Sequence, residues 1–132
     1  MIGCVLSGRF EITTFIASGG MGSIYKATQR PLDRDVAIKV MDYQGRRSEE
    51  FQRRFYLEAS LCARLSHPNI VRIFDYGCHD ERIYFIAMEY LKGQTLGQIS
   101  REAGPLAPAR TIGFLKQVSS ALVEAHLSLI HI

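Results

Sequence analysis

The sequence predicts an α+β fold, in which a five-stranded antiparallel sheet carries one packed helix and further helices follow. Short β-rich runs with alternating apolar residues fill residues 10–41 and return between residues 70 and 89. From residue 48, between these two regions, apolar residues recur at intervals of three and four, which is the spacing of an amphipathic helix. From residue 96 the spacing is helical again, which predicts a short helix and then a long one.

Composition places the chain among globular domains. Of its 132 residues, 47% are hydrophobic and 22% are charged, which argues against a disordered segment. Sixteen Lys and Arg stand against thirteen Asp and Glu, so the net charge is only +3 and we expect no nucleic-acid partner. The single basic cluster is interpreted as a solvated helix end, because no base-stacking aromatic residues accompany it. It consists of Arg46, Arg47, Arg53 and Arg54.

The cysteines and the apolar runs indicate in which cellular compartment we expect the chain. Cys4, Cys62 and Cys78 are odd in number and unpatterned, so they predict a reducing compartment and no disulfide framework. No histidine pairs with them at a ligand spacing, so we expect no metal site. No apolar run approaches the roughly 20 residues that span a bilayer, and the first residues lack the basic start of a signal peptide. We expect a cytoplasmic chain without a membrane segment.

The first three predicted strands frame a glycine cluster. The residues from Ser18 to Gly22 suit an open hairpin tip, because glycine tolerates backbone conformations that other residues avoid. On the third strand the period of two places Lys39 on the same face as Ala37, and Val36, Ile38 and Val40 on the other. The three strands are predicted over Phe10–Ala17, Ser23–Thr28 and Arg34–Met41.

The first helix is predicted from Ser48 to about Leu65, with Ser48 as N-cap and acidic residues in the first turn. Glu58 falls within the predicted apolar stripe. An unpaired carboxylate in such a place costs several kcal/mol, so the pattern predicts a cationic partner for it. The stripe is Phe51, Phe55, Glu58, Cys62 and Leu65.

The remaining elements are two strands and two helices. Strands are predicted over Ile70–Tyr76 and Ile83–Glu89, with a polar turn over Cys78–Arg82 between them. A short helix is predicted near Leu96–Arg101, and a long helix from about Pro108. The apolar stripe of the long helix has little within this sequence to pack on. It is formed by Leu115, Val118, Leu122, Ala125 and Leu129.

The glycine cluster by itself is compatible with a flexible hairpin that binds nothing. Its position between two strands excludes the dinucleotide fingerprint and the Walker loop, because both must open a helix. Lys39 on the next strand changes the interpretation, because a lysine there can bind nucleotide phosphates while Glu58 fixes its side chain. The same pairing would satisfy the predicted inward carboxylate.

This ordered set of motifs resembles the amino-terminal lobe of a eukaryotic-type protein kinase, and is most similar to the bacterial serine/threonine kinases. The resemblance rests on the loop Gly19–Ala27, the run Val36–Lys39, Glu58, the stretch His67–Val71 and the segment Glu89–Leu91, and it covers nearly the whole chain. It implies a kinase N-lobe with hinge over residues 1–92. Residues 93–132 would then supply helices of an incomplete C-lobe.

The resemblance implies ATP as cofactor and a protein as substrate in the full-length family. Lys39 would contact the α- and β-phosphates, Glu58 would pair with Lys39, and Met88 would be the gatekeeper. Cys62 and Ile73 match the family's regulatory hydrophobic spine. The residues implied in nucleotide binding are Ala17, Ser18, Gly19, Gly20, Gly22, Ile24, Ala37, Lys39, Met88, Glu89 and Leu91.

The sequence departs from the family pattern in two places. Ala17 stands where the first loop glycine is usual. Leu129, Ile130 and His131 resemble the approach to the catalytic loop, but Ile132 replaces its arginine. The catalytic Asp, the metal-binding Asn and the Asp-Phe-Gly motif are absent from this sequence, and with them the ligands for Mg²⁺. We therefore expect the 132-residue chain alone to be inactive.

Three interpretations stay open at this level. The first is the front part of a protein serine/threonine kinase. The second is a non-catalytic module, similar to a pseudokinase, that binds a nucleotide or a partner protein. The third is an unrelated sheet-and-helix binding protein, for which the loop, Lys39, Glu58 and the hinge would all have to coincide in order.

Overall fold

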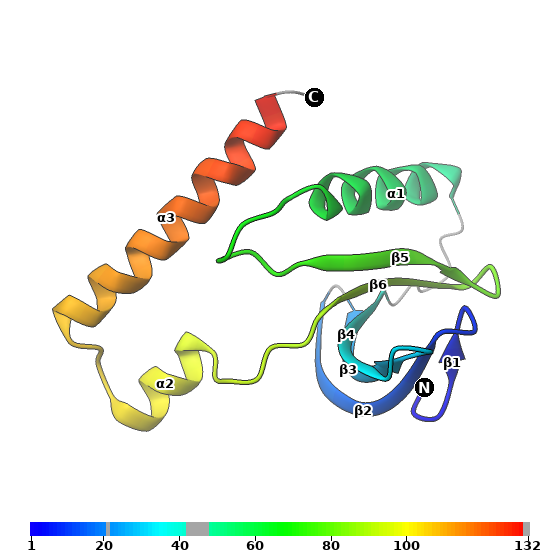
Figure 1. Cartoon of the computed structure of the whole chain (residues 1–132), viewed down its shortest axis with the longest axis horizontal. Helices are drawn as coiled ribbons and strands as arrows, with labels where there is room; N and C mark the ends of the chain where they lie inside the picture. Colours follow the sequence, from blue (N-terminus) through cyan, green and yellow to red (C-terminus); the bar gives the residue numbers. More distant parts are fainter. Residues whose placement is uncertain (21, 42–47, 131–132) are drawn as a thin grey trace. The chain divides into compact units, whose positions relative to one another are not determined.

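The computed structural model describes residues 1–20, 22–41 and 48–130, and the chain divides into two compact units. The first unit comprises Met1–Arg64 and Arg72–Tyr90, and it holds the sheet and helix α1. The second unit comprises Leu65–Val71 and Leu91–Ile132, and it holds helices α2 and α3 (Figure 1).

The first unit is built on one antiparallel sheet with the strand order β1-β2-β3-β4-β6-β5. The five predicted strands are confirmed, and a sixth, the two-residue β1, was not predicted because so short a run shows no period. Two register shifts in β2 give it the bend that Figure 1 shows, since a bulge adds local twist. The strands are β1 (Val5–Leu6), β2 (Phe10–Gly19), β3 (Gly22–Gln29), β4 (Arg34–Met41), β5 (Ile73–His79) and β6 (Ile83–Glu89).

Strand β5 lies three residues further along the chain than predicted. At its start the chain is still turning, because the Ile70 N–H donates to the His67 carbonyl at 3.1 Å. At its end Cys78 and His79 still pair with β6, opposite Tyr84 and Ile83. The turn that follows is correspondingly shorter than predicted.

The core lies on one face of the sheet. Val36 and Ile38 of β4 are fully buried there and Val40 packs against them, as the period of two predicts. Phe10 and Phe85 meet edge to face, with ring centroids 5.7 Å apart. The buried cluster is Leu6, Phe10, Ile12, Ala27, Val36, Ile38, Phe85 and Ala87.

Helix α1 (Glu49–Ala63) begins as predicted and lies along β5 (Figure 1). The Ser48 hydroxyl accepts a hydrogen bond from the Phe51 N–H at 3.2 Å, which satisfies a backbone donor that the first turn leaves free. Its buried residues are Phe55 and Ala59, and the Phe55 ring lies 5.1 Å from that of Tyr84. The helix therefore packs on the sheet through its aromatic residues.

In the second unit, helix α2 (Leu96–Ala103) and helix α3 (Pro108–Ile130) confirm the two predicted helices. A capping box between Thr95 and Gln98 starts α2. The His67 imidazole bonds the Ser120 hydroxyl at 2.9 Å, which ties segment 65–71 to α3. The predicted stripe of α3 is exposed at Leu115, Val118 and Leu122, while the side chain of Leu129 lies outside the described residues.

None of the helices in the described part of the chain has the length and apolar character needed to cross a membrane.

Candidate nucleotide site

A cavity of about 290 Å³ opens between the β2–β3 hairpin and β4. It brings together seven of the residues that the sequence singled out, all from the first unit. They come from the end of β2, the start of β3 and the outer face of β4. The lining residues are Ala17, Ser18, Gly19, Gly20, Gly22, Ile24 and Lys39.

Gly22 is required by the fold itself. Its φ of +127° is one that other residues rarely adopt, and an added Cβ would lie 2.1 Å from the Val40 carbonyl oxygen. Any side chain here would push β3 away from β4. Gly22 thus fixes the distance between the hairpin and the strand that carries Lys39.

Gly19 and Gly20 differ from Gly22, because nothing in the fold requires them to be glycine. Neither has a positive φ, and an added Cβ would meet no atom within 4 Å at either position. Their lack of a side chain leaves open space against the backbone at the cavity wall. Backbone N–H groups with such access are what a bound phosphate needs.

Lys39 lies beside Ile24 on β3 and Ile86 on β6, half-buried among the strands. Among the ion pairs between residues that the structure describes, none involves Lys39. Its ammonium group lies at the cavity wall, where no carboxylate among the described residues pairs with it. A charge of that kind favours an anionic ligand.

The predicted inward position of Glu58 is wrong in this structure. Glu58 is exposed and forms no ion pair with Lys39, and Cys62, also predicted to face inward, is exposed as well. The buried side of α1 is centred on Phe55 and Ala59 and is turned away from Glu58, while Cys62 lies in the last turn of the helix, which ends at Ala63. A carboxylate in water has no desolvation penalty, so the argument for a cationic partner does not hold here.

The strands beyond Lys39 carry the residues implied in binding the base. Ala37, which is buried, is the register partner of Met88, so both lie on the same face as Lys39. The Glu89 N–H donates to the Arg72 carbonyl at 2.9 Å, so this N–H is not available to a ligand. Leu91 belongs to the second unit and its side chain is exposed.

An ion pair between β3 and β4, which the Tyr90 ring joins, was missed by the sequence analysis. The Lys26 ammonium lies 3.0 Å from an Asp35 carboxylate oxygen and 5.0 Å from the centre of the Tyr90 ring. The hydrogen bond with Asp35 raises the pKa of Lys26, and the nearby Tyr90 adds to this effect. The hairpin register could have revealed the pair, because Lys26 opposite Ala37 is diagonal to Asp35.

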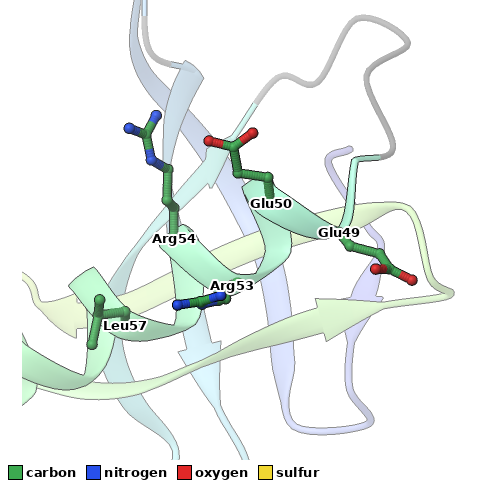
Figure 2. A pocket seen from close by; sticks show the side chains of 5 residues that line it. All are labelled: Glu49, Glu50, Arg53, Arg54 and Leu57. Atoms are coloured by element: carbon green, nitrogen blue, oxygen red, sulfur yellow. The ribbon is translucent and has the colours of Figure 1, made fainter.

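A larger cavity of about 540 Å³ lies along helix α1, but its lining favours no ligand charge. Glu49 and Glu50 balance Arg53 and Arg54, with Leu57 beside them. Figure 2 shows Glu50 and Arg54 extending to the same side of the helix. Both arginines are exposed, as predicted, whereas Arg46 and Arg47 lie outside the described residues, as does His131.

Comparison with known proteins decides the family. A model of the protein kinase domain matches residues 10–131. The chain belongs to the protein kinase family. The fold agrees, because this kinase chain superimposes on the crystal structure of the PknI kinase domain of Mycobacterium tuberculosis with a TM-score of 0.82 and 28% sequence identity. That match covers 96% of this chain and 51% of the other.

Curated relatives of this kinase chain are serine/threonine-protein kinases of bacteria. PrkC of Bacillus subtilis is 43% identical over 126 residues, which are 96% of this chain and 19% of PrkC. PknL of Mycobacterium tuberculosis is 38% identical over 122 residues, which are 92% of this chain and 30% of PknL. The chain therefore spans between about a fifth and a third of the length of these two relatives.

Proposed function

We propose that this chain is the ATP-binding part of a protein serine/threonine kinase, whose whole protein transfers a phosphoryl group from ATP to a serine or threonine of a protein. The observation that carries the proposal is the cavity wall at Gly19, Gly20 and Lys39. Two glycines that the fold does not need stand beside a lysine that pairs with no carboxylate in the described part of the chain. Open backbone and free positive charge together suit a polyphosphate.

In this proposal each residue of the site has one task. The backbone N–H groups from Ser18 to Gly20 approach the phosphates, and Lys39 binds their oxygens. Ile24 and Ala37 cover one face of the adenine ring, with Met88 behind it. The backbone of Glu89 and Leu91 binds the adenine edge. Residues 1–92 form the N-lobe with its hinge, and residues 93–132 contribute helices of the C-lobe.

The chain by itself is proposed to bind the nucleotide without transferring phosphate. The family's catalytic Asp and its Mg²⁺ ligands are not among residues 1–132. Within the described residues, no group of three His, Cys, Asp or Glu side chains could hold a metal ion. The described residues therefore offer no ligand set for Mg²⁺. We place the protein in the cytoplasm, with a protein substrate and no nucleic-acid partner.

Calorimetric titration with ATP tests the proposed site. Lys39→Met should weaken binding at least about tenfold, because it removes the charge and keeps most of the side chain's volume. Lys116→Met on α3 is the matched control, since it removes one exposed lysine charge from the second unit and should leave the affinity unchanged. Equal affinities for Lys39→Met and the unaltered chain would refute the phosphate role.

A non-catalytic binding module is the second candidate, and the absence of a Lys39–Glu58 ion pair favours it. The two candidates differ once the missing part of the domain is supplied. Joining residues 1–131 to the portion of the PrkC kinase domain that follows the matched region provides that part. Label transfer from ATP to a protein acceptor that depends on Lys39 supports the kinase, whereas ATP binding without transfer supports the module.

A further inference from the structure

A third cavity, of about 480 Å³, lies on the first unit away from the residues assigned to the nucleotide. It is formed by α1, by β5 and by the β5–β6 turn with the start of β6. Its volume falls within the range of roughly 300–1,000 Å³ that is typical of small-ligand pockets. The lining residues are Gln52, Tyr56, Cys78, Glu81 and Tyr84.

Two tyrosine rings form the walls of this cavity. The Tyr56 and Tyr84 ring centres lie 6.4 Å apart, and the ring planes meet at 74°. A third ring, Tyr76, stands 6.2 Å from Tyr56 and supports it from β5. Tyr84 is only 7% exposed, so its ring is held firmly, whereas Tyr56 is 41% exposed and faces solvent in part. The two rings touch edge to face, so the ring that a ligand can reach is the partly exposed Tyr56, and the face of such a ring attracts a cation through its quadrupole.

The polar groups of the cavity can accept hydrogen bonds, and one of them, the Glu81 carboxylate, carries a negative charge. Glu81 is exposed and has no ion-pair partner among the residues that the structure describes. Burial is the first cause of a raised pKa at both Tyr56 and Tyr84, so their phenols stay neutral at physiological pH and can accept hydrogen bonds. The Gln52 amide is hydrogen-bonded to the Tyr84 phenol and adds its carbonyl as an acceptor.

No cationic side chain lines this cavity within the described part of the chain. The neighbouring Arg53 lines the other α1 cavity instead, and Arg82 is not part of either lining. The cavity therefore combines aromatic walls, one unpaired carboxylate and several acceptors, and supplies no positive charge of its own. A ligand that complements it carries a positive charge and hydrogen-bond donors.

We propose that this cavity binds an alkylammonium group, in which the ammonium meets Glu81 and the alkyl chain lies against Tyr56 and Tyr84. A primary ammonium suits it better than a quaternary one, because its three N–H donors match the carboxylate, amide and phenol oxygens. The group can come from a lysine side chain of a polypeptide or from a free primary amine. The site is independent of the nucleotide site, so it does not rest on the function proposed above.

Amide chemical-shift titration of the 132-residue chain tests this site. The probes are n-butylammonium and its neutral counterpart n-butanol, with tetramethylammonium to measure the contribution of the donors. We expect saturable shifts with n-butylammonium around Gln52, Tyr56 and Glu81, weaker ones with tetramethylammonium, and none of that pattern with n-butanol. A short blocked peptide with one lysine then separates the sources: tighter binding of the peptide indicates a polypeptide, and tighter binding of the amine indicates a small molecule.

Glu81→Gln is the decisive variant, because it removes the charge from an exposed turn residue and preserves its size. It should weaken n-butylammonium binding at least about tenfold. Asp80→Asn is the matched control, since it removes the neighbouring carboxylate, which does not line the cavity, and should leave the affinity nearly unchanged. The proposal would be overturned if n-butylammonium did not bind, if n-butanol reproduced its shifts, or if binding survived Glu81→Gln. An equal loss of affinity in Glu81→Gln and Asp80→Asn would overturn it as well.

Discussion

The two units of this chain differ most in what they bury. Every side chain that is buried in the described residues lies in the first unit, on the strands and on α1. The second unit has well-capped helices and side-chain hydrogen bonds, yet the larger apolar residues of α3 are about half exposed. Local signals can therefore specify a helix while leaving it without a core. Stability is expected to come almost wholly from the first unit, since burial is the dominant favourable contribution.

Core truncation should separate the two units most strongly. Phe85→Ala in the first unit should lower the free energy of unfolding by about 3–5 kcal/mol, because it leaves a cavity against Phe10. Leu122→Ala on α3 should change it by less than about 0.5 kcal/mol, because that side chain is about half exposed and belongs to no buried cluster in the described residues. Urea unfolding followed by circular dichroism measures both.

A milder core substitution keeps this comparison possible if Phe85→Ala does not fold. Ile38→Val should lower the free energy of unfolding by about 0.5–1.5 kcal/mol. If Leu122→Ala were as destabilising as Ile38→Val, the contrast between the units would be wrong.

The loop glycines should divide between stability and binding. Gly22→Ala should lower the free energy of unfolding by at least about 2 kcal/mol, because its Cβ would collide with the Val40 carbonyl. Gly20→Ala should leave stability within about 0.5 kcal/mol and weaken ATP binding instead. Thermal unfolding and ATP titration of the same two proteins check this division, and comparable melting temperatures would contradict it.

Alkaline pH should destabilise the first unit selectively. All three described groups with a shifted pKa, namely Lys26, Tyr56 and Tyr84, lie in that unit, and all three are raised. The folded state thus holds these protons more tightly than the unfolded chain does. Stability is fully present below pH 10.0, the ordinary tyrosine pKa, and falls as the pH rises through that value toward the raised ones.

Urea unfolding at neutral pH and above pH 10.0 measures this loss. Tyr84→Phe should reduce the loss, since the variant has one phenol fewer to ionise, and Tyr25→Phe is the control because it removes a tyrosine hydroxyl from β3 of the same unit. A pH dependence that Tyr84→Phe leaves unaltered would show that another group dominates.

The smallest effect is expected at Glu58. Glu58→Gln should change the free energy of unfolding by less than about 0.5 kcal/mol, because the carboxylate is exposed and not paired with Lys39. Thermal unfolding of this variant beside the unaltered chain is sufficient. A loss above about 2 kcal/mol would mean that the carboxylate is buried and paired after all.

The sequence was sufficient where the signal was local or periodic. The five longer strands, the Ser48 cap and both helices of the second unit follow from alternation, spacing and capping residues within a few positions of one another. The seven residues that line the cavity of about 290 Å³ were named through the resemblance to protein kinases, whereas strand periodicity by itself only puts Lys39 on a definite face. Leu91 lies in the second unit and follows the end of β6, so strand pairing does not fix its position.

Helix α1 shows most clearly what the sequence alone could not decide. Spacing shows which residues of the helix share a face, and it assigned Glu58 to the inward side together with Phe55. The rotation is decided by the aromatic rings of Tyr84 and Tyr76, which come from strands more than ten residues away. Local spacing determined that a helix, a sheet and a glycine loop exist. Only tertiary packing decided which side of α1 is buried, because the free energy of that choice lies in contacts between distant segments.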